Sequence, residues 1–135
     1  MQTFFDTNVL VYTDDRANPA KQMRALDVLN EHKQSASGVV SLQVLQEYFV
    51  TVTRKYGIGA ADARRKVELF AAFDVVEPVL GDVLAAIDLH RLHNVSYWDA
   101  LVIHSARSAG CKQVFSEDMQ HGQVIDGVRI VNPFL

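Results

Sequence analysis

Short apolar runs alternate with longer segments of helical periodicity along this chain, and no other feature limits its possible folds so strongly. The runs typical of strands lie at residues 2–5, 38–41, 74–77, 112–116 and 128–132. Helical patterns cover residues 8–13, 20–33, 42–56, 60–73, 81–93 and 97–109. Strands separated by helices favour a parallel sheet that is covered on both faces. We therefore expect an α/β fold, a three-layer α/β/α sandwich with a central, mostly parallel sheet of about five strands.

Two of the helical segments carry apolar stripes that predict which face is buried. In the segment 20–33 the stripe consists of Met23, Ala25, Leu26 and Leu29. In the segment 42–56 it consists of Leu42, Leu45, Phe49, Val52 and Tyr56.

The composition predicts one globular domain over residues 1–135, because the chain has no linker, internal repeat or low-complexity tract. Hydrophobic residues make up 49% of it, which is enough to bury a core. Since no leader-like segment or long apolar stretch is present, we expect a soluble, cytoplasmic protein without membrane contact. The net charge of −3 gives no general attraction to nucleic acid, so such binding would need a local basic patch or bound cations.

Carboxylates lie beside the expected strand ends and helix starts. Asp6 comes directly after the first apolar run, Asp118 follows the run that ends near Ser116, and Asp99 lies at the start of the helix 97–109. In a parallel sheet, the carboxyl ends of the strands and the starts of the following helices share the edge where ligands bind. We therefore expect Asp6, Asp99 and Asp118 to be neighbours in space.

A fourth carboxylate, Glu47, lies inside the helix 42–56. On a helical wheel it points nearly opposite the apolar stripe, on the side of Arg54, which is typical of a solvated glutamate. Its helical neighbours Val44 and Val50 are apolar, however, so this helix is covered on more than one side. Periodicity therefore leaves open whether Glu47 belongs to a site or to the solvated surface.

Clustered carboxylates repel one another, and the repulsion grows as water is excluded. A hard cation relieves it: Mg²⁺ and Mn²⁺ prefer oxygen ligands together with waters and phosphate oxygens, and they support attack on a phosphodiester without a covalent nucleophile. Each acid also has a structural explanation. Asp6 can cap a helix, Asp99 can interact with a helix dipole, and Asp118 can hold an Asx-turn.

Four blocks of the sequence resemble the PIN-domain ribonucleases, and specifically the VapC-like toxins of type II toxin–antitoxin modules. The blocks are FFDTNVLVY, VSLQVLQEYF, YWDALVIHSA and VFSEDMQHG, and they span essentially the full length in the family's order. The resemblance implies an endoribonuclease that depends on Mg²⁺ or Mn²⁺ and cuts structured or single-stranded RNA, often tRNA. It also implies a homodimer that is inhibited by an antitoxin encoded beside it.

The resemblance also implies roles for individual residues. The metal-binding and catalytic acids would be Asp6, Glu47, Asp99 and Asp118. Asn8, Ser116 and Glu117 would support them, and either Glu117 or Asp118 would be the fourth acid.

Other candidate residues concern RNA and protein partners. Contacts with RNA phosphates are expected from basic residues on two successive helices, Arg54, Lys55, Arg64 and Arg65, although an ordinary charged helix face explains the same residues. Trp98 can stack on a base, but a large aromatic residue at a helix start is more typical of a buried position. The helices 42–56 and 60–73 can leave an apolar groove for an antitoxin helix, and simple core packing explains this pattern equally well.

Two rival interpretations remain. A phosphatase of the haloacid-dehalogenase type would need a second aspartate two positions after Asp6, where this chain has Asn8. The other rival is a catalytically silent PIN-like module that only binds RNA or a protein. Binding of Mg²⁺ or Mn²⁺ separates this module from the enzyme.

Overall fold

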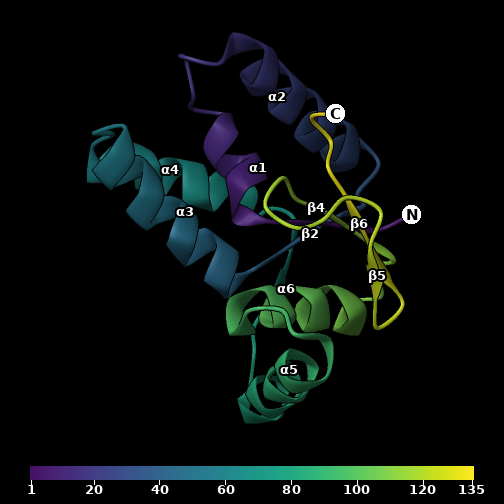
Figure 1. Ribbon diagram of the computed structural model, residues 1–135. Helices are drawn as coiled ribbons and strands as arrows, with labels where there is room; N and C mark the ends of the chain where they lie inside the picture. Colours follow the sequence, from purple (N-terminus) through teal and green to yellow (C-terminus); the bar gives the residue numbers. More distant parts are fainter.

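Six strands form one sheet in the computed structural model, which describes residues 1–135 (Figure 1). The strands are β1 (Thr3–Phe5), β2 (Gly38–Ser41), β3 (Asp74–Val76), β4 (Gln113–Phe115), β5 (Val124–Ile125) and β6 (Val128–Val131). They are ordered β3-β2-β1-β4-β6-β5, and all neighbours are parallel except β5 and β6. The expected α/β fold with a mostly parallel central sheet is confirmed.

Strand β5 is one strand more than the sequence pattern indicates. It pairs antiparallel with β6 across a turn in which Asp126 and Gly127 have φ values of 52° and 80°. Positive φ at both central residues is the geometry of a tight type I′ hairpin turn. A strand of two residues is too short to show a periodic pattern, so the Asp-Gly turn is its only signal in the sequence.

Six helices surround the sheet, and all six match expected segments. They are α1 (Thr7–Tyr12), α2 (Pro19–Gln34), α3 (Leu42–Lys55), α4 (Ala60–Phe70), α5 (Leu80–His93) and α6 (Tyr97–Ser108). Figure 1 shows α1 and α2 on one side of the sheet and α6 on the other, with α5 outermost against α6. The α3–α4 hairpin projects beside α1. No helix has the length and apolar character needed to cross a membrane.

Helix α4 ends at Phe70, three residues before the end of the expected segment 60–73. The chain then turns so that Phe73 packs back toward the sheet, with its ring 5.8 Å from that of Phe5 between centroids. A Cβ atom at Gly38 would lie 2.4 Å from the Phe73 ring, so only glycine fits at this start of β2. Packing of Phe73 against the sheet therefore takes precedence over a longer helix.

The expected stripe on α2 is wrong in part. Met23 and Leu26 are 64% and 48% exposed, whereas Ala25, Val28 and Leu29 are buried. Leu26 faces a recess between α2 and the end of α4 instead of the sheet.

The expected stripe on α3 is also displaced. Leu42 is 39% exposed, and the side chains buried most completely are Val44, Tyr48 and Val52. Helix α3 contacts α1 and β2 on one side and α4 on another. An apolar stripe on a helix with two packed sides does not identify the side that faces the main core, and here part of it faces the groove shared with α4.

The carboxyl ends of β1, β2 and β4 meet at one edge of the sheet. Strand β1 ends at Phe5 and is followed directly by Asp6. The Asp6 N–H donates to the Phe115 carbonyl at 3.0 Å, and the Asp6 carboxylate accepts the Thr7 N–H at 2.8 Å. Strand β2 ends at Ser41, whose hydroxyl accepts the Val44 N–H at 3.3 Å and caps α3. Polar side chains thus end the strands and begin the helices at this edge.

Candidate functional site

Asp6 is a nearly buried carboxylate at the end of β1, with 8% of its surface exposed. Its Oδ1 accepts the Thr7 N–H, and its Oδ2 accepts the Ser116 hydroxyl at 2.8 Å. The pKa of Asp6 is raised to about 6, mainly by burial. The hydrogen bonds from Ser116 and Thr7 oppose this rise, and the charges of Asp118 and Asp99 contribute to it. A carboxylate in this environment favours a proton or a cation.

Asn8 links the two chain segments that carry the acids. Its Nδ2 donates to Asp118 Oδ2 at 3.1 Å and to Asp6 Oδ2 at 3.4 Å, while its Oδ1 accepts the Glu117 N–H at 3.0 Å. Ser116 also lies between the acids, because its hydroxyl accepts the Asp118 N–H at 3.2 Å and donates to Asp6. The structure therefore places Asn8 and Ser116 where they orient both Asp6 and Asp118.

Asp99 lies in the first turn of α6. The Ser96 hydroxyl accepts the Asp99 N–H at 3.0 Å, and this cap fixes where the helix begins. Burial raises the pKa of Asp99, the Ser96 hydrogen bond lowers it, and the neighbouring charges of Asp118 and Glu47 raise it again. These mutual effects show that Asp99 shares its surroundings with acids from three other elements.

Glu47 is exposed, yet its carboxylate is held toward α1. Oε2 accepts the Thr7 hydroxyl at 3.0 Å, and Oε1 accepts the Gln43 amide at 2.8 Å. The structure thus brings Glu47 to the same edge as Asp6 and Asp99. Periodicity alone could not place it there, because the partner helix α1 is 40 residues away in sequence.

Glu117 and Asp118 have different surroundings, which separates the two candidates for the fourth acid. The Glu117 carboxylate accepts hydrogen bonds from Lys21 and Tyr12. Burial alone would raise the pKa of Glu117, but these two donors lower it below its usual value. Asp118 is exposed and takes part in no ion pair, so it, and not Glu117, is the carboxylate available beside Asp6.

Glu47, Glu117 and Asp118 line a cleft of about 400 Å³ between α1, α3 and the loop after β4, whereas Asp6 and Asp99 do not line it. Its lining includes Thr7, Asn8, Tyr12, Asn18, Glu47, Thr51, Lys55, Tyr56, Glu117 and Asp118. Lys55 and Arg54 also line a shallow recess beside it.

The other two basic candidates and Trp98 lie differently. Arg64 and Arg65 form ion pairs along α4, with Glu68 and Asp62, and neither lines the cleft. Trp98 is 60% exposed, which corrects the expectation that it is buried. Its only aromatic contact is with the Tyr97 ring, at 5.0 Å between centroids.

The donor set suits a hydrated divalent ion. All the grouped side chains offer oxygen atoms, and Lys21, a cation nearby, is already paired with Glu117. No three His, Cys, Asp or Glu side chains are arranged to enclose a metal ion by themselves. Mg²⁺ usually keeps several waters and takes one or two carboxylates together with substrate phosphates. The residues therefore fit Mg²⁺ or Mn²⁺ bound partly through water.

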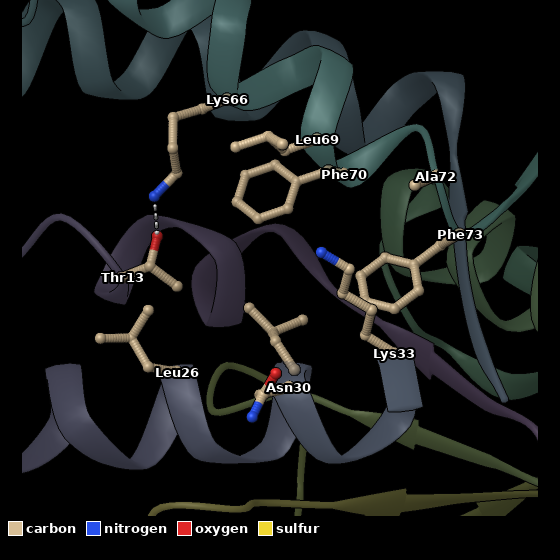
Figure 2. A pocket seen from close by; sticks show the side chains of 10 residues that line it. Thr13, Leu26, Asn30, Lys33, Lys66, Leu69, Phe70, Ala72 and Phe73 are labelled. Atoms are coloured by element: carbon tan, nitrogen blue, oxygen red, sulfur yellow. Dashed lines mark hydrogen bonds between the residues drawn. The ribbon is translucent and has the colours of Figure 1, made fainter. Parts of the chain in front are cut away.

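A separate recess of about 220 Å³ lies between α2 and the end of α4 (Figure 2). Its walls are mostly apolar, and Lys33 and Lys66 bring ammonium groups to it. The Lys66 ammonium donates to the Thr13 hydroxyl at 3.0 Å, as Figure 2 shows, and to Asp14 at 3.4 Å. Because no carboxylate lines this recess, it lacks ligands for a hard cation.

Several contacts of the site are not evident from the sequence. Tyr12 and Lys21 hold Glu117 from 105 and 96 residues away, and nothing in the sequence relates them to the loop after β4. Thr7 is different, because it directly follows Asp6 in the sequence. A hydroxyl next to a candidate acid is a sequence signal for a hydrogen bond to a second carboxylate, which here is Glu47.

Comparisons with known proteins agree with this architecture. The family model described as PIN domain matches residues 3–125. No curated protein sequence matches the chain.

Three solved structures share the fold. A toxin–antitoxin complex from Klebsiella pneumoniae has a TM-score of 0.70 at 18% identity, covering 98% of each chain. VapC20 of Mycobacterium tuberculosis, a sarcin-ricin loop cleaving toxin, has a TM-score of 0.67 at 20% identity, covering 95% of this chain and 99% of that one. VapBC2 of Rickettsia felis, bound to a promoter DNA fragment, has a TM-score of 0.70 at 13% identity, covering 96% and 97%.

Proposed function

This chain belongs to the PIN-domain family, and from that premise we propose that it is a metal-dependent endoribonuclease acting in the cytoplasm as the toxin of a toxin–antitoxin pair. The observation that carries the proposal is the group of coupled carboxylates at one sheet edge, in which burial and neighbouring charges raise the pKa of Asp6 to about 6. The fold it shares with three toxin or toxin–antitoxin structures supports the biological role.

In this mechanism Asp6 and Asp99 would be the principal ligands of Mg²⁺ or Mn²⁺, and Asp118 and Glu47 would complete the site directly or through water. When bound, the ion supplies positive charge against the carboxylates and against the charge that develops on the scissile phosphate. Asn8 and Ser116 fix the positions of the Asp6 and Asp118 carboxylates relative to each other through hydrogen bonds. No side chain of the site needs to act as a covalent nucleophile.

The direct test is cleavage of RNA by the purified protein in Mn²⁺ or Mg²⁺ and in a chelator. We expect new RNA ends only when the ion is present, and mapping those ends in cells that briefly express the protein identifies the target. Binding of RNA with neither cleavage nor binding of Mg²⁺ or Mn²⁺ would favour the alternative, a catalytically silent PIN-like binding module.

Lys55 and Arg54 are the basic residues best placed for substrate phosphates, because both lie next to the cleft. Arg64 and Arg65 are also proposed to contact RNA phosphates, but each would first have to leave its ion pair with an acid on α4. Phosphate contacts supply most of the affinity for nucleic acid that does not depend on sequence.

We propose that an antitoxin helix docks in the groove between α3 and α4. This groove holds about 520 Å³ and is lined mainly by apolar side chains, namely Leu42, Leu45, Phe49, Val50, Ala60 and Val67, with Gln46 and Arg64. An apolar groove between two helices suits the apolar face of a third.

Val67→Glu on α4 is expected to weaken antitoxin binding at least about 30-fold, the cost of losing one strong contact in an interface. RNA cleavage without antitoxin should stay unchanged. Leu69→Glu, on the same helix but outside the groove, is the matched control. Titration of the antitoxin into the cleavage reaction measures both effects, and equal inhibition of the Val67 variant and the unaltered protein would contradict this docking site.

The homodimer is proposed to form through α5. Leu80, Leu84 and Ile87 follow one helical face and are 73%, 54% and 39% exposed, while α5 packs mainly on α6 (Figure 1). An exposed apolar face of this kind can pack against the same face of a second copy, as a symmetric dimer requires. Leu84→Glu should convert a dimer to a monomer in sedimentation, and an unchanged sedimentation coefficient would rule this face out.

A further inference from the structure

The cleft described above extends well beyond the acids. At one end it is bounded by Glu47 and Asp118, and from there it follows α1 and α3 to the end of α3, where Thr51, Lys55 and Tyr56 line it. Toward the end of α3 the lining adds aromatic, hydroxyl and ammonium groups, together with the Asp15 carboxylate. The cleft therefore offers a second kind of binding environment next to the acids.

Tyr56 is the half-buried C-cap residue of α3, and its position is fixed by its neighbours. The Lys55 ammonium lies 5.5 Å from the centroid of the Tyr56 ring. The phenol hydroxyl lies near the Asp15 carboxylate, and burial followed by this negative charge raises the pKa of Tyr56. Tyr56 is thus a neutral, positioned aromatic surface with a cation beside it.

Asp15 is itself held firmly, although it lies in a loop. It is 5% exposed, and its carboxylate accepts the Asn18 amide at 2.8 Å and the Ala17 N–H at 3.2 Å. These bonds leave Asn18 Oδ1 without a partner in the protein, and the Thr51 hydroxyl has none either. The far end of the cleft therefore has two hydrogen-bonding groups without a protein partner, Asn18 Oδ1 and the Thr51 hydroxyl, near the Tyr56 ring.

We propose that the far end of this cleft is a subsite for one unpaired RNA base adjacent to the scissile phosphodiester, with Tyr56 as its stacking surface and Lys55 as its phosphate contact. The proposal rests on the nuclease function above and adds the residues that would hold an unpaired base next to the scissile bond. Recognition of RNA by stacking on aromatic side chains and by hydrogen bonds to the base edge requires a base that is free of its helix. A cleft of about 400 Å³ suits one such nucleotide and not a duplex.

The test compares variants on two fluorescent RNAs of the same sequence, one single-stranded and one paired in a hairpin stem. Tyr56→Ala should raise KM for the single strand by roughly 5- to 150-fold, the loss of one base stack, with kcat nearly unchanged. Tyr56→Phe should retain most of the affinity because the ring remains. Lys55→Ala should weaken binding and reduce its salt dependence by about one phosphate contact, whereas Arg107→Ala should not, because Arg107 lies on α6, is paired with Asp126 and does not line the cleft. The paired RNA should remain uncut.

A second measurement does not depend on altering Tyr56. An RNA carrying 2-aminopurine beside the cleaved bond should lose fluorescence on binding to the Asp6→Asn protein, because the base stacks in the cleft. If the unaltered protein cuts RNA but shows neither this quenching nor a KM effect in Tyr56→Ala, the subsite is wrong while the nuclease function stands. If Tyr56→Ala weakens only antitoxin binding, the cleft belongs to a protein partner, and the proposal is overturned. Absence of all cleavage would contradict the proposed function itself.

Discussion

Asp6→Asn is expected to lower the rate of RNA cleavage by at least about 1,000-fold while the protein stays folded. Metal-ion stabilisation of a reacting phosphate is worth several kcal/mol, and each 1.36 kcal/mol is tenfold in rate. Asp6 is the most buried acid of the site and the one held by the largest number of hydrogen bonds. Single-turnover cleavage of a labelled RNA in saturating Mn²⁺ measures the effect.

The substitution keeps the shape of the side chain, so a folding defect can be distinguished from a catalytic one. The Ser116 hydroxyl can rotate to accept a hydrogen bond from the new amide, at a cost of about one hydrogen bond, 1 kcal/mol. Asp62→Asn on α4 is the control, because Asp62 is exposed and paired only with Arg65. A folded Asp6→Asn protein that cuts RNA within threefold of the unaltered rate would remove Asp6 from the mechanism.

Without metal, the free energy of unfolding is expected to fall by about 2 kcal/mol, relative to Asp6→Asn, as the pH rises from about 4 to 7. The pKa of Asp6 is raised from 3.8 to about 6 in the folded protein, and one pKa unit corresponds to 1.36 kcal/mol. Between these values the folded state keeps a proton that the unfolded state has lost, so unfolding releases a proton and higher pH favours it. The stabilisation is complete below the unfolded value and is lost as the pH passes about 6.

Denaturant unfolding at several pH values measures this difference. Comparison with Asp6→Asn removes the contributions of other groups, including Asp99, whose pKa is also raised by burial. Mn²⁺ at 100 times its Kd should restore about 2.7 kcal/mol at pH 7 in the unaltered protein. A difference that does not vary with pH would show that the pKa of Asp6 is not raised in the folded protein.

The sequence was sufficient to predict the layers of the fold and the gathering of carboxylates at one edge of the sheet. Asp6, Asp99 and Asp118 each stand at a strand end or helix start, and the rule that these share one edge of a parallel sheet brings them together without any knowledge of side-chain contacts. The prediction of the fold was correct because it rested on a local pattern, the alternation of strand-like and helical segments.

What the sequence could not predict depends on contacts between distant segments. Glu47 is directed to the site by Thr7, and Glu117 is drawn away from it by Lys21. These partners are far apart in the chain, so the choice between Glu117 and Asp118 needed the structure.

The stripe predicted on α3 was right for Leu45 and Val52, which are buried, but it left out Val44 and Tyr48. A helix packed on two sides carries apolar residues on both, and periodicity does not show which side faces the main core.

The most direct test of the proposed metal site is to measure the binding of Mn²⁺ to the purified protein at pH 7 by isothermal titration calorimetry. The unaltered protein and Asp62→Asn should bind the ion alike. Asp6→Asn should weaken binding by more than the roughly 10- to 100-fold that is typical of losing an outer-shell partner of a metal. Equal affinity in Asp6→Asn, or no binding by the unaltered protein, would contradict the claim that these four carboxylates form a metal site.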